Sequence, residues 1–219
     1  MKLNNYWRGA ALALSAAVCW GIISPVAKVL AAAGIDLMTV MVFRSLFTLV
    51  ASGLFLAFCE GREAFCFDVE HRRFYIISGI LSVAFAGGGF LTSLEYLSVP
   101  EALVIHYTFP LAAIAGSLYI THERPTALQC LAGVLIVCGV FIGMGGSVDA
   151  MLNISLPGLF WGLLAVVGMS GQALVTRRFS LRHKVDEFRL LFFSNAVGLV
   201  LLFVFKTSGT AGETSPISR

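Results

Sequence analysis

Two ionisable side chains, Arg44 and His106, lie inside otherwise apolar runs of the sequence. Arg44 stands about six positions into a run that begins at Leu37, which in a helix places it roughly 9 Å from the run's end. If that run spans a bilayer, a buried charge is costly and usually faces a cavity or a partner. Arg44 could attract a carboxylate or another anionic group of a substrate. The alternative is a structural cation bonded to helix carbonyls.

His106 stands five residues into the apolar run Ala102–Ile120. An imidazole titrates near physiological pH, so His106 could couple a proton to transport. It could equally be a neutral hydrogen-bonding group for Tyr107, Thr108 or a backbone carbonyl. Pro110 cannot donate the helical hydrogen bond to the carbonyl of His106, so the spacing predicts a kink there. The freed carbonyl beside the imidazole is a candidate substrate contact.

Three aromatic side chains complete the set that could line a binding site. Trp20 falls near the middle of the first apolar run, where an indole could stack on a substrate or pack in the core. Tyr107 follows His106 directly. Tyr96, at the end of the third run, could be an interface anchor or the lip of a cavity. We therefore expect Arg44, His106, Trp20, Tyr107 and Tyr96 to be the substrate-binding residues.

Three charged residues fall at the ends of apolar runs on one side of the expected membrane: Lys28, Glu95 and Glu101. They could pair across helices and form an outer gate. The alternative is that each snorkels to the interface and is solvated there, since exposed ion pairs contribute little.

Other polar groups have simpler interpretations. The turn Glu123-Arg124-Pro125 is a polar connection or a cytoplasmic gate, and Pro125 suits the start of a helix. Gln172 and Asn195 lie at similar depths in two later runs, which permits a hydrogen bond that joins those helices; the alternative is substrate binding.

Seven apolar runs must position these residues. The chain has 219 residues, of which 58% are hydrophobic and 12% charged, and a soluble domain of this size could not bury so much apolar surface. Each run holds about 18 to 24 residues, enough for a helix to cross a hydrocarbon core of ~30 Å. The sequence predicts an all-α integral membrane protein whose transmembrane helices lie approximately at Trp7–Leu30, Leu37–Phe58, Phe74–Leu94, Ala102–Ile120, Ala127–Met144, Leu156–Phe179 and Phe188–Phe205.

The connections between the runs alternate in charge. Most of the lysines and arginines lie in the N-terminus and in the second, fourth and sixth connections, whereas the first, third and fifth connections contain none. The positive-inside rule then places the N-terminus in the cytoplasm. We expect a multi-pass protein of the plasma membrane, or of the inner membrane if the source is a Gram-negative bacterium.

The hydropathy pattern repeats after five runs. The segment from Gly9 resembles the segment from Gly158, and Lys28 and Arg177 then end the two runs at the same offset. A repeat of five spans is inverted in the membrane, which is the architecture of secondary transporters with a site between the repeats. The expected organisation is a first repeat over residues 1–146, a partial second repeat of two helices over 147–206 and a disordered polar tail over 207–219.

These motifs resemble those of the EamA-type transporters in the drug/metabolite transporter superfamily. The resemblance extends from Gly9 to about Phe205, and its clearest stretch runs from Ser93 to Gly139. The residues that carry it are Trp20-Gly21, Pro25, Lys28, Arg44, the segment Ser93–His106, Phe109-Pro110-Leu111, His122-Glu123-Arg124-Pro125, Gln129, Gly133 and Gly139. Such proteins usually have ten helices from two five-helix repeats, whereas this chain has seven predicted helices.

The resemblance implies secondary transport, with export expected, of a small organic solute such as an amino acid or a related metabolite. Rigid-body rocking of the repeats would alternate access to the site. The alternative is a non-transporting or incomplete membrane subunit that needs a partner chain. We expect no enzyme, cofactor, metal or nucleic-acid partner; the expected partners are the solute, the lipid bilayer and either a second copy or a complementary membrane chain. The sequence holds no nucleophile–base set, no metal cluster and no phosphate loop. We expect the five cysteines to be small apolar groups buried in the membrane rather than disulfides or metal ligands.

Overall fold

The computed structural model describes residues 2–61, 65–66, 69–143 and 154–213, and the regular secondary structure within these ranges is helical. Six helical stretches are long and apolar enough to cross a membrane, and a shorter apolar helix covers Ala127–Ile142. The prediction of an all-α, multi-span protein is confirmed. The elements are α1 (Lys2–Ala32), α2 (Leu37–Cys59), α3 (Val69–Ser78), the π-helical segment η2 (Gly79–Gly88), α4 (Gly89–Tyr96), α5 (Val99–His106), α6 (Phe109–Ile120), α7 (Ala127–Gly143), α9 (Leu156–Ser180) and α10 (Glu187–Glu213).

Local signals set several of the helix boundaries. Gly34, just after α1, has a φ of 79°, the left-handed conformation that often ends helices. Asp36 then caps α2, because its carboxylate accepts hydrogen bonds from the backbone of Met38 at 3.0 Å and of Thr39 at 3.1 Å. Helix α9 begins after Ser155, with Pro157 in its first turn. Helix α10 continues to Glu213, through the first part of the region in which the sequence predicts a disordered tail, and 214–219 lie outside the described residues.

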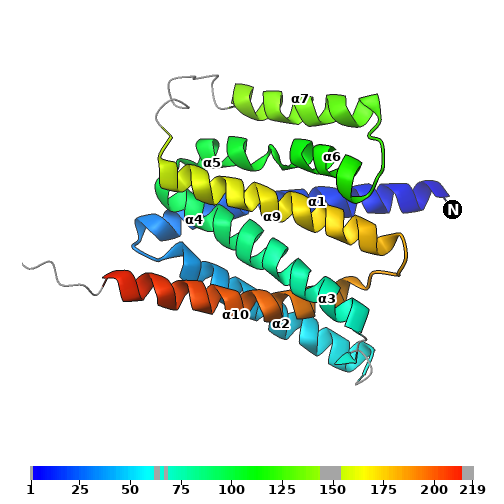
Figure 1. The fold of residues 1–219 in the computed structure, drawn as a ribbon, viewed down its shortest axis with the longest axis horizontal. Coiled ribbons are helices and arrows are strands. Elements are labelled where there is room, and N and C mark those ends of the chain that lie inside the picture. The colour runs from blue at the N-terminus through cyan, green and yellow to red at the C-terminus, as the bar shows by residue number, and fades with distance from the viewer. Residues whose placement is uncertain (1, 62–64, 67–68, 144–153, 214–219) are drawn as a thin grey trace, which may run out of the picture.

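The helices lie side by side in a bundle whose centre is α9 (Figure 1). On one side of α9 lie α5, α6 and, beyond them, α7. On the other side lie α3, η2 and α4, which together form the third span and are called helix three below. Helix α10 packs along α2 and against helix three. The two helices of the predicted second repeat therefore lie against helices of the first.

Glycines allow helix three to approach α9 until the two backbones touch. A Cβ placed on Gly89 would lie 2.9 Å from the carbonyl oxygen of Trp161 and 3.1 Å from the nitrogen of Ala165. A Cβ on Gly168 of α9 would collide with the backbone nitrogen of Ala86 and lie 2.5 Å from the carbonyl oxygen of Leu81. Small residues at such an interface permit the close van der Waals packing that holds membrane helices together.

Helix three also contacts α10 through glycines. A Cβ on Gly79 would lie 2.6 Å from the carbonyl oxygen of Ser194, and one on Gly198 would collide with the side chain of Val83. Gly79 and Val83 both belong to η2, whose wider π-helical turns are rare in proteins and often mark functional regions. Helix three is thus held tightly between α9 and α10.

Helix α1 is buried along only part of its length. Its side chains from Trp7 to Ile22 are exposed, whereas Ser24 and Ala27 are buried. The apolar core near Ala27 joins the later half of α1 to α2, η2, α4, α5, α9 and α10, and its buried members are Ala27, Leu37, Met41, Val42, Val83, Leu91, Leu94, Leu97, Ala102, Ile105, Val166 and Leu202.

Candidate functional site

His106 lies at a break in the fourth span. Helix α5 ends at His106, Tyr107 and Thr108 connect the two pieces, and α6 begins at Phe109. The imidazole is buried, and its Nδ1 atom has no hydrogen-bond partner among the described residues. Its ring centroid lies 4.7 Å from that of Phe90 and 5.7 Å from that of Phe109. A buried polar atom without a partner is costly, so this position is suited to receive a proton, a water molecule or a ligand group.

The backbone at the break shows why the helix is interrupted there. The Tyr107 N–H donates to the carbonyl of Leu103 at 2.8 Å, but the Thr108 N–H donates to Ile105 at 3.1 Å, which is a tighter turn than an α-helix. Pro110 has no N–H and cannot donate to the carbonyl of His106. The sequence predicts one kinked helix over 102–120; the structure has two helices, and the span begins earlier, at Val99.

Tyr107 is the one predicted aromatic that lies beside His106, with ring centroids 6.0 Å apart. Its side chain is partly exposed. Tyr96 lies elsewhere, at the end of α4, with its side chain half exposed and its carbonyl accepting a hydrogen bond from the Ser155 hydroxyl at 3.2 Å.

Lys28 and Glu95 meet the backbone at the end of the bundle where α1 and α4 end and α2 begins. The Lys28 ammonium donates to the carbonyl of Leu94, and the Glu95 carboxylate accepts from the backbone N–H of Leu37 at 3.1 Å. Both charges thereby satisfy helix-end groups that lack intrahelical partners. Among the described residues, no ion pair joins Lys28 to Glu95 or to Glu101.

Glu101 has a local role in the structure. Its carboxylate accepts a hydrogen bond from the backbone N–H of Ser98 at 2.7 Å, and the Ser98 hydroxyl accepts from the backbone of Glu101. This reciprocal arrangement is a capping box at the start of α5. The motif Ser98-Val-Pro-Glu101 is visible in the sequence and was the signal that could have placed the helix start.

Arg44 and Trp20 are both exposed side chains, on α2 and α1 respectively. The structure describes no contact that joins either of them to His106. The five predicted substrate-binding residues thus fall into one adjacent pair, His106 and Tyr107, and three separate positions.

A shallow apolar groove of about 330 Å³ lies between α2 and α10, next to Arg44. Arg44 stands one helical turn from the groove, and its carbonyl accepts a hydrogen bond from the Thr48 hydroxyl at 2.9 Å. The stacked rings of Phe55 and Phe188, with centroids 3.8 Å apart, form its far part. The lining residues are Phe47, Thr48, Ala51, Ser52, Phe55, Phe188 and Leu191.

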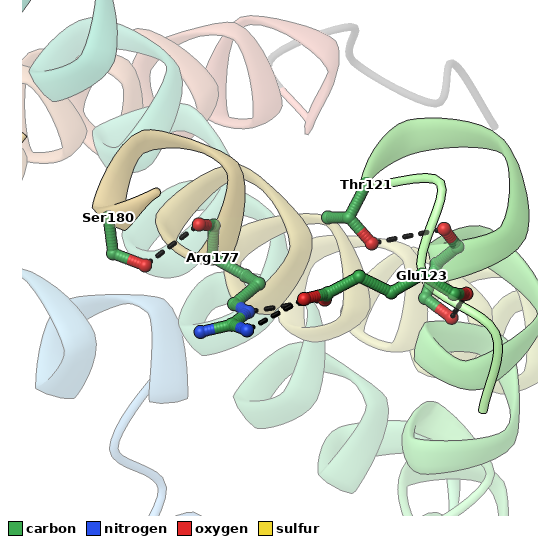
Figure 2. Close-up of polar contacts among 5 residues, drawn as sticks. Thr121, Glu123, Arg177 and Ser180 are labelled. Atoms are coloured by element: carbon green, nitrogen blue, oxygen red, sulfur yellow. Dashed lines mark hydrogen bonds and ion pairs between the residues drawn. The ribbon is translucent and has the colours of Figure 1, made fainter. Parts of the chain in front are cut away.

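Two ion pairs that connect the predicted repeats lie at the end of the bundle where α2, α6 and α9 end and α10 begins, here called the arginine-rich end. Arg177, near the end of α9, donates two hydrogen bonds to the Glu123 carboxylate, at 3.2 and 2.6 Å (Figure 2). The bonded Arg177 guanidinium lowers the pKa of Glu123. Arg189 of α10 pairs with Glu60, which follows α2, at 3.1 Å.

A polar contact ties α10 to α2 at the opposite end. The Lys206 ammonium donates to the Thr39 hydroxyl at 2.6 Å and lies 3.9 Å from the Asp36 carboxylate. Partial burial raises the pKa of Asp36, but the hydrogen bonds from Thr39 and Met38 and the Lys206 charge outweigh it, so the pKa is lowered. Helices α2 and α10 are therefore joined by polar contacts at both ends of their packed length.

The described residues contain no group of three or more histidines, cysteines or carboxylates placed to hold a metal ion. The five cysteines are free, and their side chains are exposed on the surface of the bundle. In a membrane-spanning bundle, exposed apolar side chains contact lipid.

This arrangement of six long apolar helices and a shorter seventh, with a broken span and a buried histidine, is that of a multi-pass α-helical membrane protein. The chain belongs to the EamA-like transporter family, whose model matches residues 7–144, the region from α1 to α7. The family resemblance stated from the motifs is confirmed.

Curated relatives include the uncharacterized inner membrane transporter YhbE of Escherichia coli strain K12 and proteins of the same name from Escherichia coli O157:H7 and Shigella flexneri. Each is 27% identical over 165 residues, which cover 73% of this chain and 50% of the relative. The chain thus spans about half the length of the curated relatives it matches. No solved structure gives a significant match.

Proposed function

We propose that the chain acts in the secondary transport of a small organic solute, such as an amino acid or a related metabolite, with export as its direction. The N-terminus and the arginine-rich end would face the cytoplasm, as the distribution of lysine and arginine favours. The membership in a transporter family supports this class of function over an enzyme.

The observation that carries the proposal is the broken fourth span beside a buried histidine. Secondary transporters commonly build their sites from discontinuous helices, because the break frees backbone groups for a ligand inside the membrane. Here the break at Tyr107–Thr108 adjoins His106, whose Nδ1 atom has no described partner. We propose that the solute or a coupled proton binds at this break.

Flux measurements on the purified chain in proteoliposomes test the proposal. We expect uptake of at least one solute from a mixture of labelled amino acids, driven by a pH gradient. His106→Ala should lower the flux and flatten its pH dependence, and His106→Gln should keep hydrogen bonding but lose the pH dependence. Tyr119→Ala, at an exposed position of α6, is the control and should transport normally. An unchanged pH profile in His106→Ala would contradict proton coupling through His106. Absence of flux for every solute would contradict transport by this chain alone.

A second candidate is a membrane subunit that transports only together with another chain or a second copy. It is favoured by the exposed face of α1 from Trp7 to Ile22 and by the half-length match to the curated relatives. The intact mass of the protein in its native membrane, followed by chemical cross-linking there, separates the candidates. A mass near 23.5 kDa with a cross-linked membrane partner supports the subunit, and a mass larger by about three helices supports a longer transporter.

A further inference from the structure

A second, smaller cavity of about 150 Å³ opens at the arginine-rich end, between the end of α6 and the end of α9. It is well below the ~300–1,000 Å³ of typical small-molecule sites, so it suits one chemical group rather than a whole solute. Its lining residues are Ile120, Thr121, His122, Arg178, Leu181 and Arg182.

Arg178 and Arg182, at the end of α9, line the cavity from one side. Arg178, Leu181 and Arg182 are spaced by three and four residues, which places them together on one helical turn. His122, two residues after the end of α6, lines the cavity from the other side. Its φ of 56° makes it the one described residue other than glycine with a positive φ. Strained backbone of this kind is concentrated at functional sites.

The charged side chains around the cavity give it a net positive charge. Glu123 is the carboxylate next to His122, and its two oxygens are already bonded by Arg177 (Figure 2). The structure describes no carboxylate partner for Arg178 or Arg182. The carbonyl ends of α6 and α9 carry partial negative charge, so an anion bound here must be held by the two guanidinium groups.

The position of the cavity points to the source of that anion. The spans Val99–Ile120 and Leu156–Ser180 both end beside it, so in a membrane crossed by these spans the arginines would lie at the level of the lipid headgroups. Guanidinium groups bind phosphate through paired hydrogen bonds. Ile120 and Leu181 add aliphatic surface where acyl chains would begin, and basic pockets between membrane helices are known sites for anionic headgroups.

We propose that Arg178 and Arg182 bind the phosphate of an anionic phospholipid headgroup in the cavity between α6 and α9. The lipid would brace the α6–α9 junction next to the pair between Glu123 and Arg177. That the lipid belongs to the cytoplasmic leaflet rests on the orientation proposed above, whereas the binding site itself does not.

Native mass spectrometry of the full chain in detergent tests the proposal, with phosphatidylglycerol as the probe and phosphatidylcholine as the zwitterionic comparison. Arg178→Gln combined with Arg182→Gln should weaken retention of phosphatidylglycerol by about 25-fold, at about fivefold per arginine. The matched control is Arg72→Gln with Arg73→Gln, which removes the same charge from exposed positions of α3 and should change retention by less than about twofold. Circular dichroism verifies that both variants are folded.

Three results would overturn the proposal: equal loss of retention in both double variants, no loss in either, or equal retention of phosphatidylcholine by the unmodified chain. Displacement of phosphatidylglycerol by millimolar inorganic phosphate would overturn the lipid source and indicate a soluble phosphate ligand. Charge-conserving changes of both arginines to lysine should give intermediate retention, because lysine keeps the charge but lacks the planar fork. These measurements are independent of solute flux, so failure here leaves transport untouched.

Discussion

The contact between Gly168 and helix three offers a sharp test of how the two predicted repeats pack. A Cβ at residue 168 would collide with the backbone nitrogen of Ala86 and lie 2.5 Å from the carbonyl oxygen of Leu81. Both are backbone atoms, which cannot rotate away as a flexible side chain can. The substitution Gly168→Ala must therefore push α9 and helix three apart.

The size of the effect follows from two opposing terms. Overpacking a core by one carbon typically lowers the free energy of unfolding by about 1–3 kcal/mol. Because the neighbours of residue 168 are rigid, we take the upper part of this range, about 2–3 kcal/mol. Alanine is better than glycine in a helix interior by about 1 kcal/mol. The net loss is about 1–2 kcal/mol, which at about 2–4 °C per kcal/mol for a chain of this size lowers the Tm by about 2–8 °C.

Gly139 supplies the matched control, because a Cβ there would meet no described atom within 4 Å. Gly139→Ala should therefore raise the free energy of unfolding by about 1 kcal/mol, through helix propensity alone, and raise the Tm by about 2–4 °C. Both variants are compared with the unmodified chain by thermal unfolding in detergent, followed by circular dichroism and by loss of the monodisperse peak. If Gly168→Ala is as stable as Gly139→Ala, the backbones of α9 and helix three do not touch, and the packing described here is wrong.

Three further predictions concern the helix ends. Ser98→Ala should destabilise α5 by about 1 kcal/mol, measured as a lower Tm, because it removes one half of the capping box with Glu101; an unchanged Tm would mean that the cap is unimportant. Asp36→Ala should also cost about 1 kcal/mol. Because the pKa of Asp36 is lowered from 3.8, the gap in stability between the unmodified chain and this variant should be constant above about pH 5. It should close as the pH falls below 3.8, and a gap that grows in acid would contradict the assignment. Arg177→Gln should speed hydrogen exchange in residues 121–126 while leaving the Tm nearly unchanged, since an exposed pair contributes little to stability; the lowered pKa of Glu123 means that the native pair should persist to below pH 4.5.

Helix positions could be predicted well from hydropathy because the boundaries carry strong local signals. The predicted span Leu37–Phe58 differs from α2 by one residue, and Asp36 caps it. The predicted span Leu156–Phe179 also differs from α9 by one residue, with Ser155 and Pro157 marking its start. These signals are short-range, so one sequence contains them in full.

The interruptions within the spans could not be predicted from the same pattern. Hydropathy does not reveal whether a backbone N–H bonds to the carbonyl four residues earlier, as in an α-helix, or five residues earlier, as in a π-helix. The π-helical turns of η2 therefore could not be predicted from it. The sequence predicts a kink at Pro110, but the helix break lies two residues earlier, at Tyr107–Thr108. Pro110 lacks the N–H that would donate to the carbonyl of His106, and the tightened turn begins just after that carbonyl. Both features depend on how the backbone bonds inside the folded bundle.

The partners of the polar side chains could not be predicted from the sequence either. Glu123 stands 54 residues from Arg177, and only the packing of α6 on α9 brings them together. The predicted bond between Gln172 and Asn195 is wrong: the first donates to the Thr176 hydroxyl at 3.0 Å and the second to the Leu191 carbonyl at 2.8 Å, each within its own helix. Acceptors one turn away are always in reach, whereas a cross-helix partner requires a matching rotation of both helices.

The glycine contacts of helix three determine which parts of the molecule can move together. Any sliding between helix three and α9 would have to separate backbone atoms at Gly89 and Gly168 at the same time, and the contacts with α10 at Gly198 would resist it as well. Helix α1, in contrast, takes no part in these glycine contacts, and its side chains from Trp7 to Ile22 are exposed. The tightest packing therefore crosses the boundary between the predicted repeats, because helix three of the first is locked against α9 and α10 of the second.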